Sequence, residues 1–214
     1  MKTYSAQISD YIKKALLKGE LKPGDKIKEV QLASALSISR APVREALQLL
    51  VNNGLVVSLP QKGKFIKKLS ADEIRDGYFI GGVLEGAAAA LSLDLLTRSD
   101  FDNMETLLSR MSDLQPSSTD YGEQLANLDI AFHDALLAKT PNRLIVEQAR
   151  AVCQRRSKFL LFNFWPKAFS LDEVVERHKR VLAAALTGSK QTVETTLREH
   201  YEELGERMAA LAEH

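Results

Sequence analysis

The stretch Ser39-Arg40-Ala41-Pro42-Val43-Arg44-Glu45-Ala46-Leu47 has the pattern of a helix that presents arginines near its N-terminal end. Ser39 is a favourable N-cap, because its hydroxyl can accept a hydrogen bond from an otherwise unpaired backbone N–H. Pro42 lies in the first turn, where its missing N–H costs nothing. Apolar residues recur at helical spacing from Val43 onward and predict one buried face. Arg40 and Arg44 lie one turn apart on another face, as expected for the recognition helix of a helix-turn-helix.

The residues on both sides of this helix predict a winged helix-turn-helix. Apolar residues from Tyr4 to Leu16 are spaced as a first helix, and those from Leu32 to Ile38 as a second helix and turn. Asn53-Gly54 ends the recognition helix, and two strand-like segments then enclose the donor-rich turn at 60–64. The alternative interpretation is a capped surface helix with two solvated arginines, which does not account for this hairpin.

The charge of the chain is distributed unevenly. Residues 1–70 contain 13 Lys and Arg against 5 Asp and Glu, a net charge of +8, whereas the remaining 144 residues carry −7. The net charge of +1 for the whole chain hides this asymmetry. A basic segment of this size favours a polyanion through the release of counterions. Double-stranded DNA is therefore the expected partner of the N-terminal part.

From residue 71 onward the chain is predicted to be all helical. Ser70 and Glu73 form a capping-box pattern that opens a new helix. We expect about six helices, with bounds near 72–96, 99–113, 119–138, 142–164, 171–187 and 189–212. The predicted fold class is mainly α, with a winged helix-turn-helix in residues 1–70 and an all-α helical bundle in residues 71–214.

The run from Lys26 to Ser70 closely resembles the DNA-binding domain of the GntR family of bacterial transcriptional regulators. The resemblance implies that Arg40 and Arg44 contact DNA and that Gly63 lets the wing approach the duplex closely. The expected DNA-binding residues are Ser39, Arg40, Pro42 and Arg44 of the recognition helix and Lys62, Gly63 and Lys64 of the wing. Many relatives carry an arginine at the position of Val30, so their operator sequences cannot be transferred to this chain.

One aspartate and three of the four histidines lie on or beside apolar faces of predicted helices. Asp129 and His133 are four residues apart and share a helical face, while His178 and His200 lie on the last two helices. Three imidazoles and a carboxylate suit a divalent ion such as zinc, nickel, cobalt or manganese. Each histidine taken alone is more often a hydrogen-bonded core residue than a metal ligand.

The helical part is similar to the effector-binding domain of the FadR-type branch of GntR regulators, called FCD, from about residue 72 to 212. In many members of that branch, an Asp and a His four apart and a His on each of the last two helices bind a metal. The resemblance therefore implies that Asp129, His133, His178 and His200 hold a divalent ion, foremost zinc, nickel or manganese. It also implies a small organic acid as the effector and a homodimer formed by this domain.

One departure from the family pattern affects the effector site. Relatives often carry, on the first helix of this domain, an arginine that contacts the carboxylate of the effector, and Gly81 takes its place here. Glu85 remains nearby, and we expect it in the effector site, or in surface pairing or packing at the domain interface. The expected substitutes for the missing cation are Arg143, Arg150, Arg155 and Arg156.

These features predict a ligand-responsive regulator that binds a pseudo-palindromic operator as a dimer and represses catabolic genes. One alternative is a metal-dependent enzyme with a DNA-binding domain, but no HExxH motif, nucleophile elbow or phosphate loop accompanies the histidines, so we do not expect an enzyme. Another is a regulator whose metal site is structural or vestigial. No apolar run is long enough to span a bilayer, and with a single cysteine, Cys153, we expect a cytoplasmic protein without a membrane partner.

Overall fold

The computed structural model describes residues 3–152, 158–161 and 164–213. Within these residues the chain forms two compact units. Unit 1 comprises Met1–Leu69 with Lys158–Asn163, and unit 2 comprises Ser70–Ser157 with Phe164–His214. The expected helix over 142–164 is described in two pieces, and Cys153, Arg155 and Arg156 lie outside the described residues.

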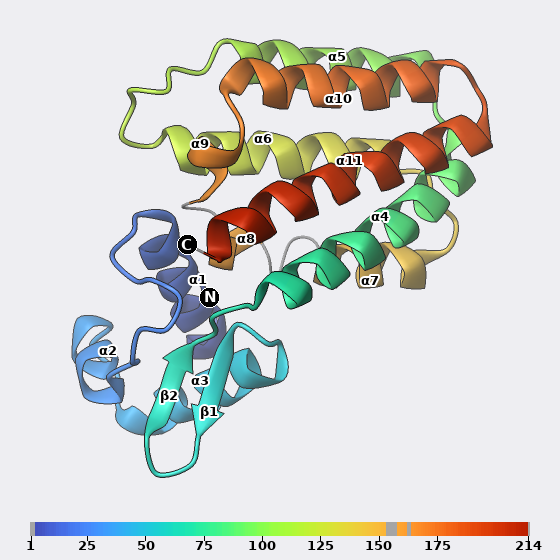
Figure 1. The fold of residues 1–214 in the computed structure, drawn as a ribbon. Helices are drawn as coiled ribbons and strands as arrows, with labels where there is room; N and C mark the ends of the chain where they lie inside the picture. Colours follow the sequence, from blue (N-terminus) through green and yellow to red (C-terminus); the bar gives the residue numbers. More distant parts are fainter. Residues whose placement is uncertain (1–2, 153–157, 162–163, 214) are drawn as a thin grey trace. The chain divides into compact units, whose positions relative to one another are not determined.

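Unit 1 contains three helices followed by an antiparallel hairpin, and one short helix from later in the chain (Figure 1). Its elements are α1 (Tyr4–Leu17), α2 (Glu29–Ala35), α3 (Arg40–Asn52), β1 (Val56–Leu59), β2 (Gly63–Ile66) and α8 (Lys158–Leu161). The strands pair from Val56 opposite Ile66 to Leu59 opposite Gly63. The core of the helical part is formed by the buried faces of α1 and α3, with Ile8, Ile12, Leu16, Val43, Leu47 and Leu50. This is the predicted winged helix-turn-helix.

The start of α3 differs from the prediction in one detail. Ser39 occupies the N-cap position in an extended conformation, but its hydroxyl makes no capping hydrogen bond. A capping hydroxyl accepts from the N–H of the second or third helical residue. The third residue of α3 is Pro42, which has no N–H, so one of the two usual donors is missing.

Two glycines with positive φ lie at turns of unit 1, one at the end of α3 and one at the tip of the hairpin. Gly54 has a φ of +71° just after α3, as the Asn-Gly stop predicts. In the hairpin turn, Gly63 has a φ of +102°, and an added Cβ would lie 3.4 Å from Cε of Lys26. Because L side chains rarely adopt this conformation, the turn itself requires glycine at position 63.

Unit 2 is helical throughout its described residues (Figure 1). Its elements are α4 (Ala71–Leu93), α5 (Arg98–Ser112), α6 (Tyr121–Leu136), α7 (Arg143–Val152), α9 (Trp165–Ala168), α10 (Leu171–Leu186) and α11 (Lys190–Ala212). Apart from α7 and the short α9, each begins and ends within three residues of the predicted bounds. The predicted capping box of Ser70 and Glu73 opens α4. The predicted fold class, a winged helix-turn-helix with an all-α bundle, is confirmed.

The stretch between the predicted helices 142–164 and 171–187 contains a short helix that was not predicted, α9, which begins at Trp165. Proline is tolerated in the first turn of a helix, because the N–H groups of that turn have no partner within the helix.

Among the described residues, no helix is long and apolar enough to cross a membrane.

Helices α4 and α11 lie side by side along much of their lengths and approach closely at glycines (Figure 1). A Cβ added at Gly82 would lie 3.0 Å from Cβ of Tyr201 and 3.1 Å from Cα of Arg198. A Cβ added at Gly86 would lie 3.1 Å from the backbone oxygen of Glu194. The small residues thus let α4 bring its buried side chains close to those of α11.

We expect Gly82→Ala to lower the free energy of unfolding by about 1–3 kcal/mol, because the added methyl group meets backbone and Cβ atoms that cannot rotate away. Gly77→Ala on the same helix is the matched control, since nothing lies within 4 Å of its added Cβ. There the helix preference of alanine predicts a gain of up to about 1 kcal/mol. Chemical denaturation measures both, and equal stabilities of the two variants would contradict the close packing.

Candidate DNA-binding surface and metal centre

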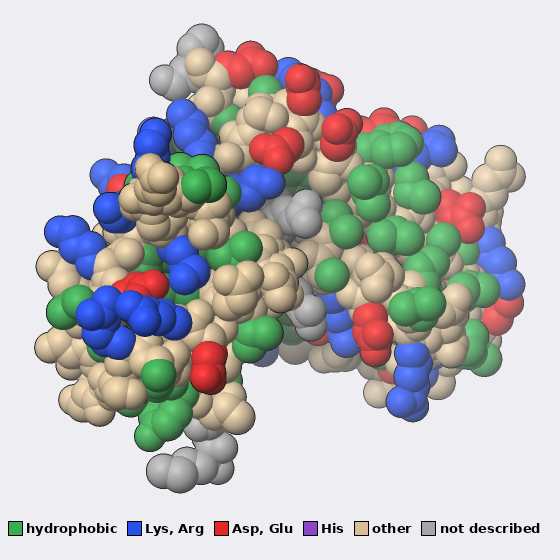
Figure 2. Space-filling view, turned by 90° about the horizontal axis from the view of Figure 1, so that it is seen from below, with side chains coloured by type: hydrophobic (Ala, Val, Ile, Leu, Met, Phe, Trp, Pro, Cys, Tyr) green, Lys and Arg blue, Asp and Glu red, His purple; other side chains and the backbone are tan. Residues whose placement is uncertain are grey.

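The N-terminal end of α3 presents two exposed arginines. The side chains of Arg40 and Arg44 are 55% and 59% exposed. Figure 2 shows Lys and Arg side chains gathered over unit 1, on the left of the view. Arginine can pair bidentately with guanine or bind a phosphate. This end of α3 therefore has the chemistry expected of an element that reads a major groove.

Glu29 of α2 joins these arginines to the hairpin. Its carboxylate lies 2.9 Å from Nε of Arg44, 3.4 Å from Nζ of Lys64 and 3.8 Å from Nη2 of Arg40. The hydrogen bond from Arg44 holds the pKa of the Glu29 carboxyl below its usual range. Three cations from α3 and β2 are thus gathered around one carboxylate. This role of Glu29 could not be predicted from the sequence, because the residues that meet are up to 35 positions apart.

The other predicted DNA-binding residues differ in accessibility. Ser39, Lys62 and Gly63 are exposed, and Pro42 is half-buried. The side chain of Lys64 is only 16% exposed, because it turns toward Glu29. Val30, at the position where many relatives carry arginine, is 60% exposed. An apolar side chain there can make contacts to a duplex but no polar ones.

The three predicted histidine ligands meet in the interior of unit 2. His133 of α6, His178 of α10 and His200 of α11 are all buried, and each offers a ring nitrogen within 4.8 Å of the others. Asp129, one turn before His133, is also buried. Its Oδ1 lies 3.0 Å from Nε2 of His178 and 3.9 Å from Nε2 of His133. The three predicted histidine ligands are therefore brought together, and the fourth predicted ligand, Asp129, lies beside two of them.

The hydrogen bonds of His178 orient one ring nitrogen toward this cluster. Its Nδ1 lies 2.7 Å from the backbone oxygen of Val174, an acceptor, so Nδ1 carries a proton. In the neutral ring, Nε2 is then an acceptor that faces the Asp129 carboxylate. Two acceptors at 3.0 Å repel each other unless a proton or a cation lies between them. This arrangement fits a metal ion.

Glu85 is buried beside the histidine cluster. It is 3% exposed, and its carboxylate is bonded to Nδ1 of His133 and accepts a hydrogen bond of 2.7 Å from the hydroxyl of Tyr201. The alternative of surface pairing is wrong, because position 85 lies on the buried face of α4. A carboxylate bonded to the far nitrogen of a histidine is the usual outer support of a metal ligand. His133 is thereby left with Nε2 on the side of Asp129.

His200 completes the cluster as a neutral ring. Burial, and then the positive charge of Arg177, lowers the pKa of His200 well below its usual range. Its Nδ1 is buried and makes no hydrogen bond within the described part of the chain. A neutral imidazole with an unused nitrogen is the form that binds a metal. The described residues therefore hold three histidines that could bind an ion.

A buried cation that the sequence did not reveal lies beside His200. Arg177 is 5% exposed and donates a hydrogen bond from Nη2 to the backbone oxygen of His200. Burial lowers its pKa to about 10, so it stays charged at neutral pH. Its guanidinium lies 4.2 Å from the ring centre of Phe169. Residue 177 was missed because a charged residue next to His178 is also typical of a solvated helix face.

The two arginines proposed from the sequence as effector contacts lie elsewhere. Arg143 and Arg150 are both on the exposed side of α7, whose buried residues are Val146 and Ala149. Arg150 forms an ion pair of 2.9 Å with Asp134. Neither position supports a contact inside a buried pocket.

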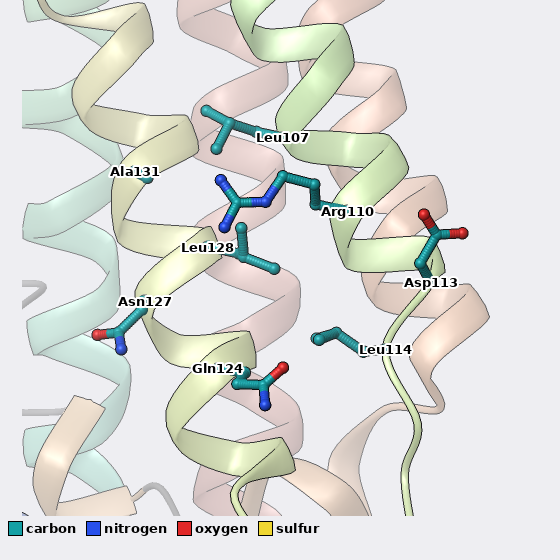
Figure 3. Close-up of a pocket in the computed structure, with 8 residues that line it drawn as sticks. All are labelled: Leu107, Arg110, Asp113, Leu114, Gln124, Asn127, Leu128 and Ala131. Carbon is teal, nitrogen blue, oxygen red and sulfur yellow. The ribbon is translucent and has the colours of Figure 1, made fainter.

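Two hollows of comparable size lie between helices of unit 2. One, of about 540 Å³, lies between α10 and α11 and is lined in part by Arg177 and His200. The other, of about 490 Å³, lies between α5 and α6. Figure 3 shows the side chain of Arg110 extending from α5 toward α6 in this second hollow, with Gln124 and Asn127 on the α6 side. Only the first of these two hollows includes a histidine of the cluster.

Two family models match the chain. The model described as bacterial regulatory proteins of the gntR family matches residues 4–66, and the FCD domain model matches residues 78–203. The first match covers the winged helix-turn-helix, and the second covers the histidine cluster.

Curated relatives are transcriptional regulators. LutR of Bacillus subtilis is 29% identical over 205 residues, which cover 85% of this chain and 90% of LutR. RspR of Escherichia coli, described as a repressor, is 25% identical over 94% of this chain and 86% of its own length. YdhC of B. subtilis is 31% identical over 140 residues, but the alignment spans only 65% of this chain and 62% of YdhC.

Solved structures share the fold. E. coli McbR/YncC superposes with a TM-score of 0.77 at 24% identity, over 100% of this chain and 98% of that chain. A GntR-type protein from Rhodococcus sp. RHA1 superposes with a TM-score of 0.74 at 21% identity, over 98% and 99% of the two chains. At these identities the likeness shows the fold alone.

Proposed function

The chain belongs to the GntR family of transcriptional regulators and carries an FCD domain, and on this premise we propose that it binds operator DNA through α3 and the hairpin. The observation that carries this proposal is the pair of exposed arginines, Arg40 and Arg44, at the N-terminal end of α3. Ser39, Pro42, Lys62, Gly63 and Lys64 complete the proposed surface. Fluorescence anisotropy with duplexes from the region upstream of its own gene tests it.

We propose further that the protein acts as a homodimer on a pseudo-palindromic operator and represses transcription. Winged-helix and helix-turn-helix proteins read two half-sites when two recognition helices are presented by a two-fold dimer. The repressor function of RspR favours repression, by analogy alone. Sedimentation with and without a duplex carrying two half-sites measures the stoichiometry, and one chain per duplex at saturation would contradict it.

The buried cluster is proposed to hold one divalent ion with Asp129, His133, His178 and His200 as ligands. The facing acceptors of His178 and Asp129 and the outer support from Glu85 favour this assignment. When bound, such an ion supplies open coordination positions for an anionic ligand. A small organic acid is therefore the proposed effector, and Glu85 acts on the site through His133.

Regulation follows if the effector binds one state of the protein better than another. A ligand shifts an equilibrium only by its difference in affinity for the two states. The alternative of a metal-dependent enzyme receives no support, because the relatives are transcriptional regulators. The alternative without a metal is a protonated His178 paired with Asp129. Elemental analysis of the purified protein distinguishes these two hypotheses.

We expect Glu29→Gln to reduce the preference for operator over unrelated DNA by about tenfold. The change removes the carboxylate that holds Arg44 and Lys64 in place, and it removes a negative charge that opposes phosphate binding. Affinity for a scrambled duplex should rise while affinity for the operator falls. Glu45→Gln, an exposed glutamate of α3, is the control. Unchanged affinities for both duplexes in Glu29→Gln would show that Glu29 positions nothing.

A further inference from the structure

We propose that Arg177 binds the carboxylate of the effector in the hollow between α10 and α11, and that Glu203 is an internal carboxylate which the effector displaces. The inference rests on the proposed function, in which a small organic acid is the effector. It assigns the cation that Gly81 fails to supply to a different helix, α10.

Arg177 has the properties of an anion-binding residue. It is nine-tenths buried, yet it lines the hollow of about 540 Å³ together with His200. Its Nη1 lies 2.9 Å from Oε2 of Glu203, but this nitrogen makes no hydrogen bond with good geometry among the described residues. A buried guanidinium N–H without a hydrogen bond is costly. A ligand carboxylate in the hollow would satisfy it and gain a charge-assisted hydrogen bond.

Glu203 occupies the position that such a carboxylate would take. It is 35% exposed, and its oxygens lie 2.9 Å from Arg177, 3.5 Å from Arg180 and 3.0 Å from Arg207. Three arginines thus share one carboxylate. Arg207 also pairs at 2.9 Å with Glu173. If Glu203 kept only Arg207, Arg177 and Arg180 would be available to an incoming anion.

The lining of the hollow narrows the chemical class of the ligand. Besides the arginines and His200, it includes hydroxyl groups from Thr192 and Thr196 and a second carboxylate, Glu199. Hydroxyls favour a ligand that carries hydroxyl groups, while Glu199 disfavours a second negative charge. A volume of this size suits a small molecule. The expected class is therefore a small hydroxy acid with a single carboxylate.

The hollow between α5 and α6 does not compete as the carboxylate site. Its cation, Arg110, is exposed, and the acidic Asp113 lies in the same lining (Figure 3). Water solvates an exposed guanidinium, so an anion gains little there. Arg110→Met is accordingly the matched control for Arg177→Met.

The test uses the full-length protein loaded with metal and four probes, namely glycolate, lactate, 3-hydroxybutyrate and threonate, with their uncharged amides as controls. Calorimetry should show binding of at least one acid and of none of the amides. Arg177→Met should weaken that binding by about ten- to hundredfold, the effect of losing a charge-assisted hydrogen bond. Arg110→Met should leave it unchanged.

Glu203→Gln gives a second, opposite readout that does not depend on the stability of Arg177→Met. Without the competing charge, the acid should bind several times more tightly. Equal or weaker binding by Glu203→Gln, or unchanged binding by a folded Arg177→Met, would overturn the inference while leaving the organic-acid effector in place. Binding of no acid by the wild-type protein would overturn both.

Discussion

Arg44→Ala is expected to weaken operator binding by about ten- to hundredfold. A bidentate arginine contact to guanine contributes about 1–3 kcal/mol of discrimination, which corresponds to that range. The loss should be large here because Val30 offers no polar contact beside it, so Arg40 and Arg44 carry more of the polar recognition. Anisotropy titrations at fixed salt measure the change, since affinities for DNA depend steeply on salt.

A control separates base recognition from general electrostatics. Arg143→Ala removes the same charge from an exposed position on α7, and it should leave operator affinity unchanged. If Arg44 reads a base, Arg44→Ala should lose affinity for the operator more than for a scrambled duplex. If it binds a phosphate, both affinities should fall alike and the salt dependence should become shallower by about one ion. Unchanged affinity for both duplexes would remove Arg44 from the interface.

His178→Ala is expected to abolish stoichiometric metal binding and to leave DNA binding by the apo protein intact. The variant removes the ring whose Nε2 faces Asp129 and which comes from α10, so the remaining ligands come from α6 and α11 only. In the wild-type protein, chelation should lower the melting temperature by about 5–10 °C, if the metal was present at about a hundred times its dissociation constant. Elemental analysis and thermal melts measure both quantities.

The metal assignment has a matched carboxylate control on the same helix. Asp129→Asn removes a buried carboxylate next to His178, whereas Asp134→Asn removes a half-buried one that pairs with Arg150, five residues later. Only Asp129→Asn should lower the metal content. The metal assignment would be contradicted if the wild-type protein is purified without any divalent metal and its melting temperature does not change with chelator or added ions. His178 and Asp129 would then be paired through a proton.

The elements of the fold could be predicted because their signals are local. Ser70 and Glu73 are three residues apart, and a capping box depends on that spacing alone. Gly54 marks a helix end through its own backbone conformation. The failures are equally local in origin. Ser39 was expected to cap a helix whose third residue, Pro42, has no N–H to donate. The short helix α9 was not predicted, although proline fits a first helical turn.

The site could be predicted only in part, because its contacts join distant parts of the chain. Asp129 and His133 share a helical face, His178 and His200 lie on or beside apolar faces of two other predicted helices, and the family resemblance implied that the four bind one metal. The contact between Glu85 and His133 was not predicted, since the two residues are 48 positions apart and the burial of Glu85 depends on how α4 packs.

The residues that were missed had no local signature. Glu29 on α2 pairs with Arg44 on α3. Arg177 on α10 contacts His200 and Glu203 on the following helix, α11. A charged residue in a mixed sequence looks like any solvated position until its neighbours in space are known. The exposed arginines of α7 were chosen from the sequence for the same reason.

The central claim is sequence-specific DNA recognition by the intact protein. The most direct measurement is its affinity, at physiological salt, for overlapping duplexes that tile the region upstream of its own gene. We expect one fragment to bind at least about a thousandfold more tightly than the others, the lower end of the range for specific recognition. Equal, weak binding to every fragment would contradict it.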